Sequence, residues 1–295
     1  MKKGTLFFVH AALTSVAFIY GVSYILLKEI TPVPFKPFPL VFIRTFGSFI
    51  FMWLLCLLLK VNQRIETRRD YFSLFLCGVC GASINQLFFF SGLSRTSSIN
   101  TGLIVISIPV FVVIISRFWK KEKITLSKAI GILLGMIGSA IIIINSAKSN
   151  GNQDDSLGDL FVLANCVLYA LYLIIVKPLT AKYPPLVVSK WMFFFGFLIN
   201  IPLCFTSFTE TSWTGISVES ILILVYLITI VTAAGYLLNT WALKHVSTAV
   251  VSFYVYLQPL FTGIGATLFL NEHFGMLKLT SALLIFIGVY LVNRD

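Results

Sequence analysis

The stretch Asn85-Gln86-Leu87-Phe88-Phe89-Phe90-Ser91-Gly92-Leu93 has a diverged copy 150 residues later, and this repetition decides how the chain folds. The copy ends in Asn239-Thr240-Trp241-Ala242-Leu243, and the offset continues beyond it without a gap. The matched pairs are Leu93/Leu243, Ser97/Ser247, Pro109/Pro259, Phe111/Phe261 and Glu122/Glu272. Ungapped agreement over this length indicates an internal duplication, so two copies of one structural unit are predicted.

The composition places both copies in a lipid bilayer. Hydrophobic residues make up 58% of the 295 residues and charged residues only 11%, which is too little polar surface to cover a soluble globule. The net charge of +11 does not indicate nucleic-acid binding, because the basic residues form short clusters between apolar runs rather than one basic face. The expected surrounding is therefore lipid, and no nucleic-acid partner is expected.

Ten apolar runs are each close to the roughly 20 residues that cross a bilayer as a helix, so ten transmembrane helices are predicted. Their approximate ranges are 4–27, 40–59, 71–93, 100–119, 127–145, 159–176, 187–205, 221–243, 249–270 and 277–292. The hydrophilic segment 147–156 is the expected linker, because its Gly, Asn, Ser and Asp residues favour turns. The expected domains are therefore 1–146 and 157–295.

The distribution of Lys and Arg among the loops gives the expected orientation. With a cytoplasmic N-terminus, 15 basic residues lie on the cytoplasmic side and 5 on the other, so both termini are expected to be cytoplasmic. An odd number of helices in each unit forces the second unit to cross the membrane in the opposite direction. The predicted fold is an all-α integral membrane protein with ten transmembrane helices in two inverted five-helix repeats.

A set of residues that recurs in the same order through both halves resembles the EamA domain. The set consists of Gly21, Lys28, Pro39, Arg44, Gly92-Leu93, Ser97, Pro109 and Glu122, with the counterparts Lys177, Pro185, Lys190, Leu243, Pro259 and Glu272. The chain thus resembles, over essentially its whole length, a two-domain member of the drug/metabolite transporter superfamily. The resemblance implies an inner-membrane carrier or exporter of small metabolites. It leaves the solute open among amino acids, sugars, nucleosides and toxic organic compounds.

Polar residues at membrane depth are the candidates for a solute site, because each is costly in lipid and tends to face the bundle interior. Asn85 and Phe89 share a helix face, as do their repeat mates Gly235 and Asn239. The candidate substrate-binding residues are Tyr20, Asn85, Gln86, Phe89, Asn100, Tyr169, Asn239, Tyr254 and Gln258. For each amide the alternative is an interhelical hydrogen bond that only holds the bundle together. For each aromatic ring the alternative is core packing or a place in the aromatic belt at the membrane interface.

Two basic residues occupy equivalent places early in the second and seventh predicted helices. Arg44 and Lys190 are expected to bind a carboxylate or the C-terminal carbonyls of a neighbouring helix, or else to extend to the membrane interface. The interface is the favoured interpretation for both.

Nothing in the sequence indicates catalysis, a metal site or a cofactor. Cys77 and Cys80 form a CxxC pattern within an apolar run and have no second pair, which favours packing over metal or redox chemistry. The chain contains no GxSxG, P-loop or HExxH pattern, so an enzyme is not expected.

These features predict a secondary-type transporter that moves small organic metabolites, such as amino acids or related solutes, by alternating access. The expected mode is export or exchange across a bacterial inner membrane. All 11 carboxylates fall in predicted loops, at termini or at helix ends, which favours facilitated diffusion or exchange over proton antiport. The alternative function is a membrane structural or sensory protein that transports nothing. A second alternative is an enzyme that acts on lipid, which would need a cluster of His, Asp or Ser at one interface that this chain lacks. The sequence specifies neither the solute nor the oligomeric state.

Overall fold

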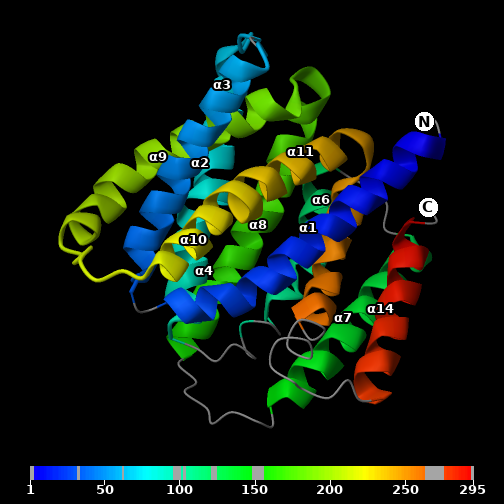
Figure 1. The fold of residues 1–295 in the computed structure, drawn as a ribbon. Helices are drawn as coiled ribbons and strands as arrows, with labels where there is room; N and C mark the ends of the chain where they lie inside the picture. Colours follow the sequence, from blue (N-terminus) through cyan, green and yellow to red (C-terminus); the bar gives the residue numbers. More distant parts are fainter. Residues whose placement is uncertain are drawn as a thin grey trace.

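A computed structural model of the chain is a helical bundle (Figure 1). It describes residues 3–31, 34–61, 63–95, 101, 104–120, 125–147, 156–262 and 276–293. Every regular element in these ranges is helical, and none of the described residues is in a strand. This confirms the predicted all-helical class, in which each helix satisfies its own backbone hydrogen bonds, as a bilayer requires.

The first half contains six helical segments and one π-helical turn among the described residues. They are α1 (Lys3–Ile30), α2 (Pro37–Leu58), α3 (Arg68–Cys77), η1 (Gly78–Ala82), α4 (Ile84–Leu93), α6 (Ile108–Lys120) and α7 (Leu126–Ala147). The start of α2 follows from Pro37, whose fixed φ suits the first turn of a helix and whose missing N–H would have no partner there. The start of α3 is fixed by Thr67, whose side chain accepts a hydrogen bond from the backbone N–H of Asp70.

The second half contains helices of the same kind. They are α8 (Ser156–Lys182), α9 (Pro185–Thr209), α10 (Val218–Tyr226), η2 (Leu227–Ala234), α11 (Gly235–His245), α12 (Thr248–Phe253), η3 (Tyr254–Leu257) and α14 (Met276–Asn293). Side-chain caps fix the starts of α10 and α12. The Ser217 hydroxyl accepts a hydrogen bond from the backbone N–H of Ser220, and the Ser247 hydroxyl accepts one from the backbone N–H of Val250.

Six of these segments are long and apolar enough to cross a membrane. Their ranges are 4–23, 37–58, 68–93, 156–182, 185–209 and 218–245. The described residues also include shorter apolar helices at Ile108–Trp119, Leu126–Gly138 and Leu279–Val292. Multi-pass membrane insertion therefore follows from length and composition, whereas the count of ten helices remains a prediction.

Large apolar side chains cover much of the outer surface of the bundle. Phe7, Leu57, Leu58, Phe118 and Tyr290 are all exposed, and Phe118 has 82% of its surface accessible. In water such a surface would be an aggregation hazard, but lipid tails solvate it.

Both long segments that follow the second helix of their repeat are interrupted by π-helix. The turn η1 separates α3 from α4, and η2 separates α10 from α11. At the repeat offset of 150, residues 78–82 correspond to 228–232, which lie inside η2. The interruption therefore belongs to the repeated unit. Short π-helical stretches inside α-helices are frequent at functional sites, because the extra residue frees and redirects backbone groups.

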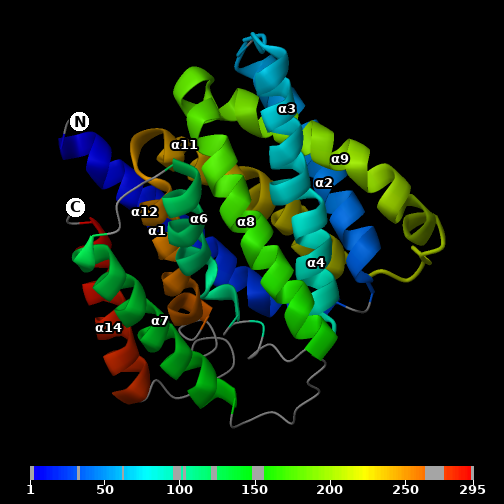
Figure 2. The ribbon, with the colours of Figure 1, turned by 180° about the vertical axis from the view of Figure 1, so that it is seen from behind.

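The two halves interlock rather than forming separate globules. Helix α2 packs along α9, and α4 packs along α8. Helices α7 and α14 lie side by side in both views (Figures 1 and 2). They approach so closely that a Cβ on Gly131 would lie 2.8 Å from the carbonyl oxygen of Gly288, and one on Gly288 would lie 2.7 Å from the carbonyl oxygen of Gly131. Small residues permit this backbone contact between membrane helices.

Candidate functional site

A small internal cavity lies where α2, η1, α4, α9, η2 and α11 meet, so both halves of the chain form its wall. Its lining residues are Val41, Arg44, Thr45, Gly81, Ala82, Gln86, Phe193, Thr232 and Tyr236. The space is about large enough for a water molecule and too small for an organic solute. Since both π-helical interruptions contribute to the wall, the irregular backbone of each repeat converges on the same place.

Arg44 is the charged group of this cavity. Only 7% of its surface is accessible, so the expectation that this side chain extends to the interface is wrong. The guanidinium donates from Nε (3.1 Å) and Nη2 (2.8 Å) to the single hydroxyl oxygen of Thr232 on η2. It also lies 5.1 Å from the centre of the Phe90 ring, within cation–π range. The side chain points inward because η2 places a polar acceptor opposite α2.

The π-helical backbone explains how Thr232 can serve Arg44. Its hydroxyl donates to the carbonyl of Leu227, five residues earlier, at 2.7 Å. The oxygen lone pairs of Thr232 therefore remain free to accept from the guanidinium. One hydroxyl thus links the turn η2 to a helix of the other half of the chain.

Gln86 and Tyr236 join the two repeats at equivalent positions. They are 150 residues apart, and the Gln86 amide donates to the Tyr236 hydroxyl at 3.1 Å. The same hydroxyl donates to the carbonyl of Gly81 in η1 at 2.6 Å. This contact therefore joins equivalent positions of the two sequence repeats. The structure therefore brings the predicted site residue Gln86 into the cavity wall.

Asn85 is buried, with 1% of its surface accessible, and holds α4 against α8. Its amide donates to the carbonyl of Asn165 at 3.0 Å, and the Asn165 amide donates to the carbonyl of Asn85 at 3.0 Å. The side-chain oxygen of Asn85 accepts from Gln86 at 3.0 Å. Asn85 thus makes interhelical hydrogen bonds that hold the bundle together, which is the alternative to a role in solute binding. It also orients Gln86, which lines the cavity.

Three predicted aromatic residues surround this region without lining the cavity itself. Tyr20 lies against α11, where a Cβ on Gly235 would be 3.0 Å from its hydroxyl oxygen. That hydroxyl is buried and has no hydrogen-bond partner among the described residues. Tyr169 accepts a long hydrogen bond of 3.4 Å from Asn239, another predicted site residue. Phe89 packs edge-on against Phe90, with ring centres 5.3 Å apart.

The remaining predicted site residues lie elsewhere. Tyr254 is buried in η3, and its hydroxyl is 2.7 Å from Nδ1 of His10 on α1. Gln258 is also buried, and its backbone carbonyl accepts from Thr262 at 3.0 Å. Asn100 lies outside the described residues. Neither Tyr254 nor Gln258 is part of the cavity wall around Arg44.

Lys190 does not share the environment of Arg44, although the two occupy equivalent places in the sequence. Its Nζ lies 4.7 Å from the centre of the Trp53 ring and 5.5 Å from that of Trp191. Aromatic rings therefore hold this ammonium away from the cavity. Both repeats thus carry a cation at this place, but only Arg44 lines the cavity.

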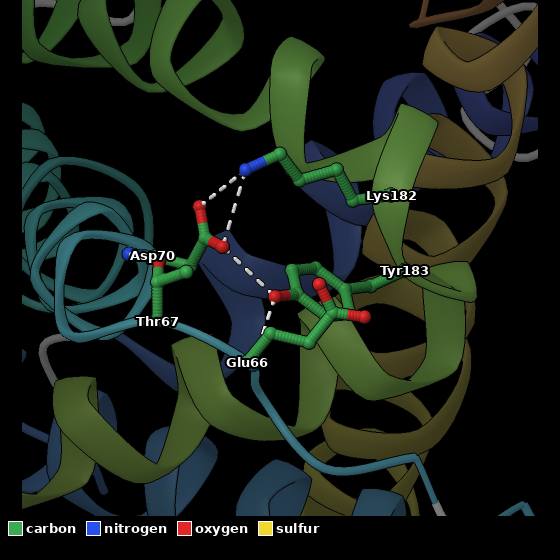
Figure 3. A network of polar contacts seen from close by, with 5 residues as sticks. All are labelled: Glu66, Thr67, Asp70, Lys182 and Tyr183. Carbon is green, nitrogen blue, oxygen red and sulfur yellow. Dashed lines mark hydrogen bonds and ion pairs between the residues drawn. The ribbon is translucent and has the colours of Figure 1, made fainter.

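A polar cluster joins the two halves at the end of the bundle that carries the α2–α3 and α8–α9 connections (Figure 3). The Lys182 ammonium is 3.0 and 3.2 Å from the two carboxylate oxygens of Asp70. The Tyr183 hydroxyl donates to the same carboxylate at 2.8 Å and accepts from the backbone N–H of Glu66 at 3.0 Å. Burial raises the pKa of Tyr183, so its phenol stays protonated as the donor. We call these four residues the end clamp.

The cysteines offer no sign of metal or redox chemistry. Cys77 and Cys80 are buried among apolar side chains with free thiols. The described residues contain no group of three or more His, Cys, Asp or Glu side chains that could hold a metal ion.

Sequence analysis missed several residues of the cavity wall. Tyr236 was detectable, because it is the repeat mate of the predicted Gln86. Thr232 and Gly81 carried no such signal, since their roles arise from π-helical geometry rather than from residue type. The orientation of Arg44 was equally hidden, because it depends on which acceptor the other repeat presents.

Comparison with known proteins identifies the family of the chain. The EamA-like transporter family matches residues 7–144 and again residues 156–294. An uncharacterized transporter from Clostridium kluyveri is 27% identical over 98% of this chain and 92% of its own length. An uncharacterized transporter from Archaeoglobus fulgidus is 24% identical over 96% of both chains. A WAT1-related chloroplastic protein from Arabidopsis thaliana is 25% identical over 95% of this chain and 68% of its own.

A solved crystal structure shares the fold, with a TM-score of 0.78 over 97% of both chains at 16% sequence identity. The family matches each half of the chain separately and together they cover almost all of it. The protein is thus a multi-pass membrane protein of the drug/metabolite transporter superfamily, and it belongs to the EamA-like transporter family.

Proposed function

We propose that the protein carries small organic metabolites, such as amino acids or related solutes, across a bacterial inner membrane by alternating access. Family membership and the transporter names of its relatives support a transporter and not an enzyme. The proposed architecture is two inverted five-helix repeats, at 1–146 and 157–295, joined by the linker 147–156. Solute leaves the cell or is exchanged, and both termini face the cytoplasm.

The observation that carries the proposal is the cavity at the junction of the repeats. Inverted-repeat transporters bind their solute near the membrane midplane, beside interrupted helices of both repeats. Here η1 and η2 are equivalent interruptions, and both contribute to the wall of one cavity. In the same cavity wall, Gln86 of the first repeat is hydrogen-bonded to Tyr236, the equivalent residue of the second repeat. The cavity has no room for a solute in this conformation, so solute binding requires the surrounding helices to move apart.

The end clamp supports alternating access, because it closes one end of the bundle across the two halves. Asp70 belongs to the first half, and Lys182 and Tyr183 belong to the second. Basic residues concentrate in the adjacent segment, at Lys60, Arg64, Arg68 and Arg69, so this end is proposed to be cytoplasmic. Opening toward the cytoplasm then requires the clamp to break.

The proposed solute site keeps the nine residues expected from the sequence and adds the cavity wall around Arg44 and Tyr236. Gln86 lines the cavity, Asn85 orients Gln86, and Tyr20 presents a buried hydroxyl against α11. Phe89, Tyr169, Asn239, Tyr254 and Gln258 are proposed to contact the solute farther along its path, and Asn100 is kept as a candidate from the sequence alone.

Solute counterflow in liposomes tests the function. Purified protein is reconstituted with a panel of unlabelled amino acids, organic acids, sugars and nucleosides inside, and uptake of each labelled counterpart is measured. A carrier gives saturable uptake that depends on the matching internal solute. Absence of counterflow for every class, from protein that remains folded, would instead support the structural or sensory alternative.

A further inference from the structure

Arg44 carries a buried positive charge that the described protein does not neutralise. Burying an ionised side chain in a membrane interior is costly unless it is paired, and such residues mark solute or ion pathways. Its hydrogen bonds go to the neutral hydroxyl of Thr232, and none of the described carboxylates forms an ion pair with it. Two bonds to one oxygen leave other N–H donors of the guanidinium without an acceptor among the described residues.

The cavity offers the space in which those donors can be satisfied. Arg44 lines it together with the hydroxyl of Tyr236 and the amide of Gln86. The hydroxyl of Tyr20, which lies against Gly235 one residue before Tyr236, is buried and has no hydrogen-bond partner among the described residues. A guanidinium with free N–H donors and a nearby hydroxyl without a partner among the described residues can together bind a small anion that has two or more acceptor oxygens.

We propose that Arg44 binds the carboxylate group of the transported solute, and that the substrates are organic monocarboxylates. This inference rests on the transport function proposed above. The guanidinium matches a carboxylate in a bidentate geometry, and the side chains of Phe193 and Val41 provide an apolar wall for the rest of the solute.

The charge balance of the site favours a carboxylate over a phosphate. A phosphate monoester carries close to two negative charges at neutral pH and calls for a second cation. The equivalent cation of the other repeat, Lys190, lies against Trp53 and Trp191 and does not line the cavity. One buried guanidinium thus balances one carboxylate.

Ligand protection of the purified protein tests this proposal. Thermal unfolding in detergent is measured with millimolar acetate, phenylacetate and L-phenylalanine, with the amide of each as an isostere that lacks the carboxylate charge, and with inorganic phosphate and phenyl phosphate. A ligand that binds the folded state raises the unfolding temperature in a concentration-dependent way. We expect at least one carboxylate to protect the protein, and its amide to bind about 10- to 100-fold more weakly.

Variants locate the effect. Arg44→Gln is expected to abolish carboxylate protection, Arg44→Lys to weaken it because the bidentate geometry is lost, and Lys190→Gln to leave it unchanged. Equal protection by amides or phosphates, protection that survives in Arg44→Gln, or no protection by any carboxylate would overturn the proposal. If Arg44→Gln does not fold, the carboxylate–amide comparison in the wild-type protein and Arg44→Lys decide.

The counterflow assay separates this inference from the function beneath it. Counterflow of neutral solutes without carboxylate protection would leave the transport function standing and reject the carboxylate site. Carboxylate protection that depends on Arg44, without counterflow of any solute, would leave the site standing and reject transport.

Discussion

Replacing Tyr183 with Phe should loosen the end clamp while leaving its neighbours in place. The change removes only the phenolic hydroxyl, which donates to Asp70 at 2.8 Å and accepts from the backbone N–H of Glu66 at 3.0 Å. The ring itself remains, so the packing of the α8–α9 turn is preserved. Asp70 has 5% of its surface accessible and cannot replace the lost bond with bulk water while the clamp is closed.

The expected size of the effect follows from these contacts. A hydrogen bond to a charged group contributes roughly 1.5–3 kcal/mol. Its loss destabilises only the closed state, because in the open state water binds Asp70 whether or not the Tyr183 hydroxyl is present. Lys182 is 54% exposed, so its ion pair contributes at most about 1 kcal/mol and does not compensate. The closed–open equilibrium should therefore shift about 10- to 150-fold toward opening.

A cysteine in the cavity reports this shift. Val41→Cys is made in a background whose five native cysteines are alanine, and an impermeant thiol reagent is applied from the side of the α2–α3 connection. Tyr183→Phe should increase the rate of modification by at least about tenfold. Tyr71→Phe is the matched control, since it removes a phenol on α3 whose ring packs on Trp191. Equal rates in the two variants would refute the gating role of the clamp.

Three further predictions concern the helix contacts and the driving force. Asn85→Leu should lower the free energy of unfolding by about 1–3 kcal/mol, because it removes a buried hydrogen bond to Asn165. Asn239→Leu should lower it by less, because only a 3.4 Å hydrogen bond is lost. Thermal unfolding of both variants measures the two losses, and equal losses would contradict the prediction. Gly131→Leu should push α7 away from α14 and lower the free energy of unfolding by about 1–3 kcal/mol or more. Ile130→Leu, on the exposed face of the same helix, should leave the free energy of unfolding unchanged. Gel filtration and the unfolding temperature distinguish the two variants. Counterflow in liposomes should persist without a pH gradient, and uphill accumulation that vanishes when such a gradient is collapsed would show that transport is proton-coupled.

The repeat and the helical class were predictable from the sequence for a simple physical reason. Membrane helices must be long and apolar, and a duplicated unit keeps its register, so hydropathy and the 150-residue offset carry most of the information. The offset even pairs Gln86 with Tyr236, which the structure shows in contact. Of the polar residues predicted at depth, Gln86 lines the cavity and Asn85 is hydrogen-bonded to it, and their role in binding a solute stays a prediction.

The details of the site were beyond such patterns. Arg44 and Lys190 look equivalent in sequence, yet one faces the cavity and the other lies against two tryptophans. The difference arises from tertiary partners: η2 offers Arg44 the hydroxyl of Thr232, and α2 offers Lys190 the ring of Trp53. A π-helical turn has no strong residue signature, so the acceptor that it presents cannot be read from spacing.

Two-sided accessibility of the cavity tests the central claim most directly. The Val41→Cys reporter is exposed to the impermeant thiol reagent in right-side-out and in inverted membrane vesicles, with Leu173→Cys, a fully buried position of α8 outside the cavity wall, as the control. Alternating access predicts modification of position 41 from either side and of position 173 from neither. Modification of position 41 from one side only, or from neither, would contradict a cavity that opens in turn to both faces of the membrane.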